Sequence, residues 1–203
     1  MIKSILKELK NHLPHTSIGV ISGIIIMLFF YNISHRTAFN IFYIFHPLHV
    51  IFSAMATASL YKIHKKGKDF NIWLFYLIGY TGVIVIATIS DSIIPYIGEV
   101  LLDLPNRGIH IGFIEKWYLI NPFALLGVTI AYFWTRSKFP HTVHVFLSTG
   151  ASLFHIIMAL GGKLDWVSSI VIVLFLFIAV WIPACGSDIV YPMLFVKDLE
   201  EKG

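Results

Sequence analysis

The amino-acid sequence predicts an all-α integral membrane protein with six transmembrane helices, arranged as two inverted three-helix repeats. Hydrophobic residues make up 57% of its 203 residues and charged residues only 13%, and the mean hydropathy is +0.80. Such a composition leaves too few charged side chains to cover a soluble domain of this size. Long apolar stretches occur throughout, and one pattern of histidine, serine and aspartate occurs in both halves of the chain.

Each long apolar stretch is interpreted as one transmembrane helix, because about 20 apolar residues cross a bilayer core of roughly 30 Å. We expect these helices at 17–34, 47–63, 70–90, 117–135, 142–160 and 166–184. The second is the weakest, since its apolar part lies between His46 and Lys62. The first stretch is not followed by the small residues typical of a cleaved signal peptide. The single cysteine, Cys185, excludes an internal disulfide.

Lysine and arginine predict the orientation, because the cytoplasmic segments of membrane proteins carry more of them. If the N-terminus is inside, eleven of these residues lie in inner segments and four in outer loops, namely Arg36, Arg107, Lys116 and Lys163. We therefore expect both termini in the cytoplasm and the protein in the cell membrane, with the lipid bilayer as its main partner. The net charge of +4 follows from this topology and gives no support to nucleic-acid binding.

The duplication is clearest in two histidine pairs, each followed by a serine and, some 40 residues later, by an aspartate. The first half has His46, His49, Ser53 and Asp91, and the second half has His141, His144, Ser148 and Asp188. The histidines and the serines are displaced by 95 residues and the aspartates by 97, and His15 with His110 forms a fainter match. Two repeats of three spans each, 1–95 and 96–203, would cross the membrane in opposite senses, as in many secondary transporters.

In this topology the repeated residues form two metal-binding constellations near opposite faces of the membrane. We expect His46, His49, His110 and Asp91 near the outer face, and His141, His144, His15 and Asp188 near the inner face. Histidines three residues apart share one helix face, and each pair lies beside a proline, which we expect in the first turn of a helix. The positive helix end keeps such imidazoles neutral, the form that binds metals. Three imidazoles and one carboxylate suit zinc, with iron or manganese as other occupants.

Simpler interpretations of these residues stay open. Histidines and aspartates at helix ends also form interfacial hydrogen bonds or caps. His155, near the middle of the fifth span, belongs either to a transport path or to a hydrogen bond between helices. Ser53 and Ser148 either line the same path or permit close helix packing. Glu99, in an outer loop eight residues after Asp91, is either a solvated carboxylate or an added outer ligand, and we expect the solvated carboxylate.

Three classes of function follow from these patterns. A metal-ion or proton-coupled transporter explains the inverted repeat most directly. The alternatives are an integral-membrane hydrolase, in which bound zinc activates water, and a haem-binding electron-transfer protein with paired histidines. The sequence leaves open whether the cargo is a metal ion or another small molecule, and whether the protein forms a homodimer.

Overall fold

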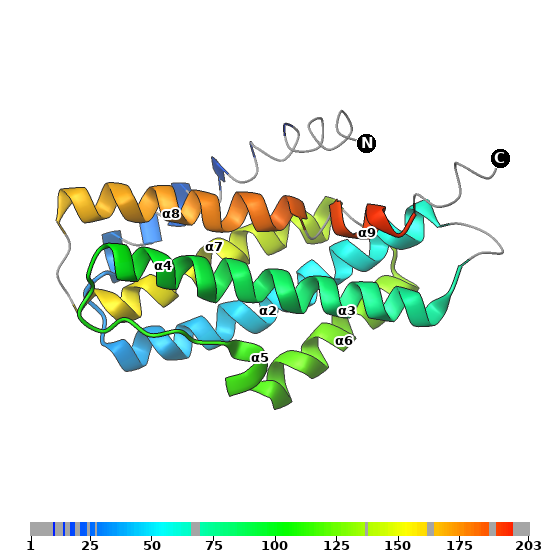
Figure 1. The fold of residues 1–203 in the computed structure, drawn as a ribbon, viewed down its shortest axis with the longest axis horizontal. Coiled ribbons are helices and arrows are strands. Elements are labelled where there is room, and N and C mark those ends of the chain that lie inside the picture. The colour runs from blue at the N-terminus through cyan, green and yellow to red at the C-terminus, as the bar shows by residue number, and fades with distance from the viewer. Residues whose placement is uncertain are drawn as a thin grey trace.

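The computed structural model describes residues 10, 14, 17–18, 21–23, 25–26, 28–65, 70–136, 138–161, 165–186 and 190–196. These residues form helices and connections with no strand among them, which confirms the predicted all-α class. The helices are α2 (His35–His64), α3 (Ile72–Thr88), the π-helix η1 (Ile89–Ile93), α4 (Ile94–Leu101), α5 (Gly112–Glu115), α6 (Trp117–Phe133), α7 (Lys138–Leu160), α8 (Trp166–Cys185) and α9 (Tyr191–Leu194). Because α3, η1 and α4 follow one another directly, they form one continuous helix (Figure 1).

Four helices in the described part of the chain are long and apolar enough to cross a membrane. They are His35–His64, Ile72–Leu101, His141–Leu160 and Trp166–Ala184. The fourth predicted span corresponds to α6, which is apolar but only 17 residues long. The first predicted span, 17–34, is described only in part. The membrane class is therefore supported by four helices, while the six spans, the inverted repeat and the orientation stay predictions.

Helix α2 begins at His35, well before the predicted start of the second span at residue 47. Ser34 caps this helix, since its hydroxyl accepts a hydrogen bond from the Thr37 backbone N at 3.2 Å. Pro47 lies within the helix, a position that transmembrane helices tolerate. About three turns of helix precede His46, so the predicted placement of the first histidine pair in a first helical turn is wrong.

The helix that begins with α3 also continues past its predicted end at residue 90. The π-turn η1 carries it on to α4, which ends at Leu101. Asp91 therefore lies inside a helix of 30 residues and not at a helix end near the membrane face. The outer loop predicted between the third and fourth spans is correspondingly shorter. Its remaining part turns back along the bundle to α5 (Figure 1).

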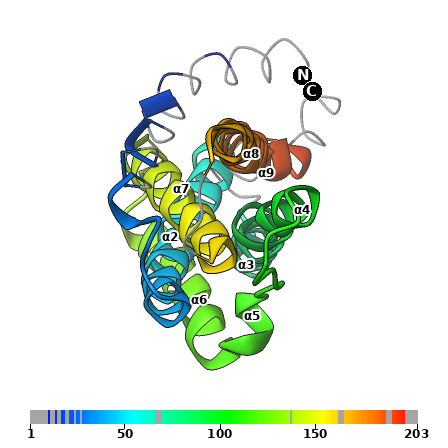
Figure 2. The same ribbon diagram turned by 90° about the vertical axis from the view of Figure 1, so that its left-hand side faces the viewer.

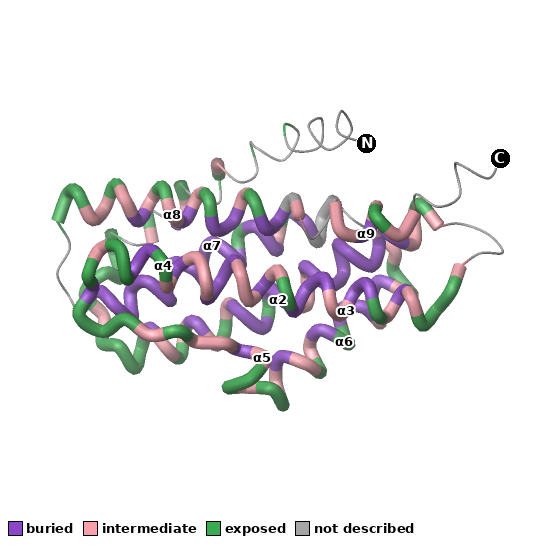
Figure 3. Tube along the Cα trace, viewed as in Figure 1, coloured by how far each residue is buried: buried purple, intermediate pink, exposed green. Residues whose placement is uncertain are grey.

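Helix α2 packs against α3, α6 and α7, and α7 also packs against α8. Seen along the bundle, α6 lies on the side opposite α8 (Figure 2). Buried residues follow α2, α7 and the inner side of α3 and α4, whereas α8 is exposed along much of its length (Figure 3). Large apolar side chains such as Trp73, Phe133 and Trp166 are more than 80% exposed. Exposed apolar surface of this kind fits contact with lipid.

The contact between α2 and α6 depends on a glycine. A β-carbon added at Gly127 would lie 2.4 Å from the carbonyl oxygen of Ile51 and 2.8 Å from Cβ of Ala54. Small residues let transmembrane helices approach in this way. Because backbone cannot yield as a flexible side chain does, Gly127→Ala is expected to destabilise the fold by about 1–3 kcal/mol. Thermal unfolding of the detergent-purified protein should show a melting temperature several degrees lower, at roughly 2–4 °C per kcal/mol.

The matched control for this substitution is Gly186→Ala. Among the described residues, a β-carbon at Gly186 would meet Cδ1 of Ile86 alone, at an ordinary contact distance of 3.8 Å. The control should melt at or above the wild-type temperature, because alanine in a helix also costs less conformational entropy than glycine. Equal melting temperatures for the two variants would contradict the tight contact between α2 and α6.

Candidate metal centre

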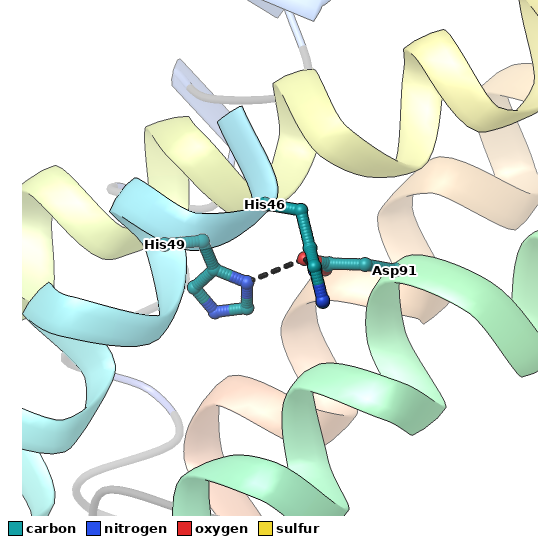
Figure 4. A group of neighbouring side chains, drawn as sticks. All are labelled: His46, His49 and Asp91. Atoms are coloured by element: carbon teal, nitrogen blue, oxygen red, sulfur yellow. Dashed lines mark hydrogen bonds and ion pairs between the residues drawn. The ribbon is translucent and has the colours of Figure 1, made fainter. Parts of the chain in front are cut away.

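Three buried side chains from two helices meet inside the bundle: His46 and His49 from α2, and Asp91 from η1 (Figure 4). The histidines lie three residues apart and so share one face of α2. Nδ1 of His46 lies 2.8 Å from Asp91 Oδ2, and Nδ1 of His49 lies 2.7 Å from the same oxygen. None of the three side chains is more than 3% exposed. The structure thus brings together three of the residues that the sequence singled out as metal ligands.

The Asp91 carboxylate accepts four hydrogen bonds in this site. A carboxylate can only accept, so both histidines carry their proton on Nδ1. The second oxygen, Oδ1, accepts from the hydroxyls of Ser90 at 2.6 Å and Ser148 at 2.9 Å. Ser148 belongs to α7, so one carboxylate links three helices. The four donors compensate for the cost of removing this group from water.

The π-turn η1 explains how Asp91 and both of its neighbours can face inward. Ser90, Asp91 and Ser92 are each at most 1% exposed, although three successive residues of an α-helix spread over more than half of its circumference. A π-turn is wider than an α-turn and is often found at functional sites. The neighbouring polar groups have partners here: the Ser152 hydroxyl donates to the Ser90 carbonyl at 2.9 Å, and the Ser92 hydroxyl to the His110 carbonyl at 2.5 Å.

The second histidine pair lies directly beside the first. The ring centroids of His49 and His144 are 5.5 Å apart, and those of His144 and His141 are 4.8 Å apart. The prediction of two sites at opposite membrane faces is therefore wrong for these two pairs. The reason is the early start of α2, which places His49 deep in the bundle against α7. The other predicted inner ligands, His15 and Asp188, lie outside the described residues.

His110, the third predicted outer ligand, does not join the cluster around Asp91 among the described residues. Its carbonyl oxygen accepts the bond from Ser92, but its ring points elsewhere. The ring centroid lies 5.4 Å from that of His155, and Nδ1 lies 3.3 Å from Glu115 Oε1. The loop that carries His110 returns along the bundle, and this path takes its ring to a different set of partners.

A buried pair that the sequence did not reveal joins α4 to α7. His155 Nδ1 donates to Glu99 Oε1 at 2.6 Å, and the Gly108 backbone N donates to Glu99 Oε2 at 3.2 Å. Glu99 is 1% exposed, so the expectation of a solvated carboxylate is wrong. One indication in the sequence that Glu99 is buried is its distance from Asp91. Residues eight apart, such as Asp91 and Glu99, return to similar faces of a helix.

The two serines of the predicted transport path differ in their surroundings. Ser148 donates to Asp91, so it holds the carboxylate in place. Ser53 is fully buried, and its hydroxyl has no hydrogen-bond partner in the described part of the chain. Both lie one turn beyond a histidine pair, as expected, and their part in a transport path stays a prediction.

The donor set has the chemistry of a transition-metal site. His46, His49 and Asp91 each offer one ligand atom, and these atoms lie within 4.8 Å of one another. A divalent cation could bind between the two Nδ1 atoms and the carboxylate if each ring carried its proton on Nε2 instead and so stayed a neutral imidazole. Imidazole with carboxylate suits zinc or iron. Comparison with known proteins adds no further chemistry: no family model matches the chain, and no curated protein or solved structure is significantly similar to it.

Proposed function

We propose that the protein transports divalent transition-metal ions across a membrane, with His46, His49 and Asp91 as its central binding site. Zinc is the cargo that best suits these donors. The observation that carries the proposal is a series of buried ionisable side chains along the inside of the bundle, with the ring of Phe42 between two of its members. Such residues are costly inside a membrane and mark ion pathways.

On one side of Asp91 the series runs from His49 to His144 and on to His141, through ring contacts of 5.5 and 4.8 Å. His141 lies in the first turn of α7. All of these histidines are at most 5% exposed. The second histidine pair therefore extends the central site toward one end of α7.

On the other side the series passes from His46 to His155 across the ring of Phe42. Phe42 stacks on His46 with centroids 5.1 Å apart and meets His155 edge-on at 5.6 Å. His155 follows His141 by 14 residues on the same helix, which is about 21 Å at 1.5 Å per residue. The series thus covers most of a hydrocarbon core of roughly 30 Å.

The two alternatives have less support. A metal-dependent hydrolase needs a site that admits water and substrate, whereas the three central side chains are at most 3% exposed. A haem at His46 would have to displace both Phe42 and the backbone of Gly112, where a β-carbon would lie only 2.4 Å from His46 Nε2. A single ion needs far less space than either ligand.

Zinc uptake into liposomes that contain the purified protein and a zinc-sensitive dye tests the proposal. Saturable uptake is expected for the wild type. His49→Ala should bind zinc more than 100-fold more weakly, since it removes a ligand and loss of a supporting group alone costs roughly 10- to 100-fold, and it should lose most of the uptake. His64→Ala is the matched control, because His64 is an exposed residue of the same helix and, among the described residues, bonds to the Leu60 carbonyl alone.

Two outcomes would contradict the proposal. Uptake by His49→Ala at the wild-type rate would show that the central site is not on the transport path. Zinc binding without uptake by the wild type would overturn transport and would turn attention to hydrolysis.

A further inference from the structure

A second group of histidines and carboxylates lies beyond Phe42, outside the central site. It contains His155 from α7, Glu99 from α4, and His110 and Glu115 from the returning loop and α5. His155 donates through Nδ1 to Glu99 at 2.6 Å. His110 faces Glu115 in the same manner, with 3.3 Å between Nδ1 and Oε1. Each imidazole is therefore held through Nδ1 by its own glutamate.

The second ring nitrogen of His155, Nε2, is buried. His155 is 1% exposed, and its Nε2 has no hydrogen-bond partner in the part of the chain that the structure describes. Nδ1 carries the proton that is donated to Glu99, so Nε2 of the neutral ring has no proton and offers a lone pair. An unsatisfied polar atom of this kind costs about 1–3 kcal/mol. The ring contacts of His155 are with Phe42 and His110, and of these only His110 is polar.

We propose that His155 and His110 bind a second divalent transition-metal ion, with Glu99 and Glu115 orienting the two rings. Metal-bound histidines commonly donate their other ring nitrogen to a carboxylate, and here two adjacent histidines do so. Two imidazoles on one tetrahedral ion, with metal to nitrogen distances of 2.0–2.1 Å, place their ring centroids about 5 Å apart. The observed separation of 5.4 Å fits this geometry.

The second site is more open to water than the central one. The side chains of His110 and Glu115 are 21% and 35% exposed, and the Tyr43 hydroxyl holds Glu115 in place with a hydrogen bond of 2.6 Å. Two protein ligands with remaining positions for water bind an ion more weakly than a closed set. A weak, accessible site suits the first contact of an ion with its path.

The position of the second site makes it the loading site of the proposed path. This role rests on the proposed transport function, whereas the binding of a metal does not. The Phe42 ring separates the two sites, since it stacks on His46 and touches His155. An ion that leaves the loading site must therefore pass this ring to reach the central site.

Zinc titration of the full chain in detergent, followed by elemental analysis, tests the second site. Two zinc ions per chain are expected for the wild type and one for His155→Ala. His110→Ala, at a partly exposed position that is safer for folding, should likewise bind one or bind the second ion at least tenfold more weakly. His64→Ala should keep both ions. If the wild type binds one zinc per chain, and this zinc is kept in both His155→Ala and His110→Ala, the loading site does not exist. The same result is expected if only water occupies the space between the two histidines.

The same titration separates this inference from the proposed function. A single zinc that is lost in His49→Ala but kept in His155→Ala would refute the loading site and leave the central site intact. A single zinc that is kept in His49→Ala but lost in His155→Ala would refute the central site and leave the loading site intact. Cobalt in place of zinc adds a spectroscopic check, because strong visible absorption is the sign of a tetrahedral cobalt ion. His110→Ala should remove the part of this absorption that comes from the second site and keep the part that comes from the central site.

Discussion

Asp91→Asn is expected to abolish zinc binding at the central site and to destabilise the bundle. The carboxylate accepts from His46, His49, Ser90 and Ser148. An asparagine amide keeps one accepting oxygen, but its NH₂ group would face two donors. Each buried donor left without a partner costs about 1–3 kcal/mol. Removal of the negative charge also weakens attraction for a cation, so zinc affinity should fall by more than the 10- to 100-fold typical of a lost supporting group.

The measurements are zinc affinity by calorimetry and thermal unfolding in the same detergent. Asp103→Asn is the matched control, because the Asp103 side chain is 88% exposed and, in the described part of the chain, pairs with Arg107 alone. Asp103 has a positive φ of 48°, a conformation that asparagine also tolerates. The control should therefore retain wild-type affinity and stability. Wild-type zinc affinity in Asp91→Asn would remove Asp91 from the metal centre.

Composition was sufficient to predict the membrane class, but it placed the ends of two helices wrongly. Hydropathy measures how well a segment suits lipid, and the stretch between His35 and His46 scores poorly because it contains several polar residues. In the bundle the polar groups at Tyr43 and His46 bond to Glu115 and Asp91. Polar residues that satisfy one another inside the protein can be part of a spanning helix, and hydropathy alone does not detect this pairing.

The central site was predictable because its information is local. The three-residue spacing of His46 and His49 defines a helix face, and Asp91 follows in the next helix of the predicted bundle. The pairing of His155 with Glu99 joins residues 56 positions apart. It depends on how α4 lies against α7, and this in turn depends on the extra helical length beyond residue 90. The error in the helix end therefore became an error about Glu99.

The duplication led to a wrong placement of the second histidine pair for a related reason. Inverted repeats put equivalent residues at opposite faces only if both histidine pairs open their helices. His141 does lie in the first turn of α7, but His46 follows about three turns of α2. His49 and His144 consequently meet inside the bundle. Whether the two halves are related by an inverted repeat stays a prediction.

Deletion of Ile89 should remove metal binding at the central site while leaving the bundle folded. A π-turn holds one more residue than an α-turn, so removing a residue from η1 allows a regular α-helix with α3 and α4 still facing their partners. In that helix Ser90, Asp91 and Ser92 can no longer all face inward. Zinc affinity should fall at least tenfold, as when a ligand is misplaced, while helix content by circular dichroism and elution as a single species should not change.

The control for this deletion is the removal of one residue from a regular α-helical turn of the same continuous helix. Leu77 lies in α3 and is 56% exposed, so its deletion loses little packing of its own. Without an adjacent π-turn, however, every later residue rotates by about 100° relative to the earlier ones, and the buried face of the helix turns toward lipid. Deletion of Leu77 should therefore prevent folding, whereas deletion of Ile89 should not. Zinc binding at wild-type affinity after deletion of Ile89 would show that the π-turn does not position Asp91.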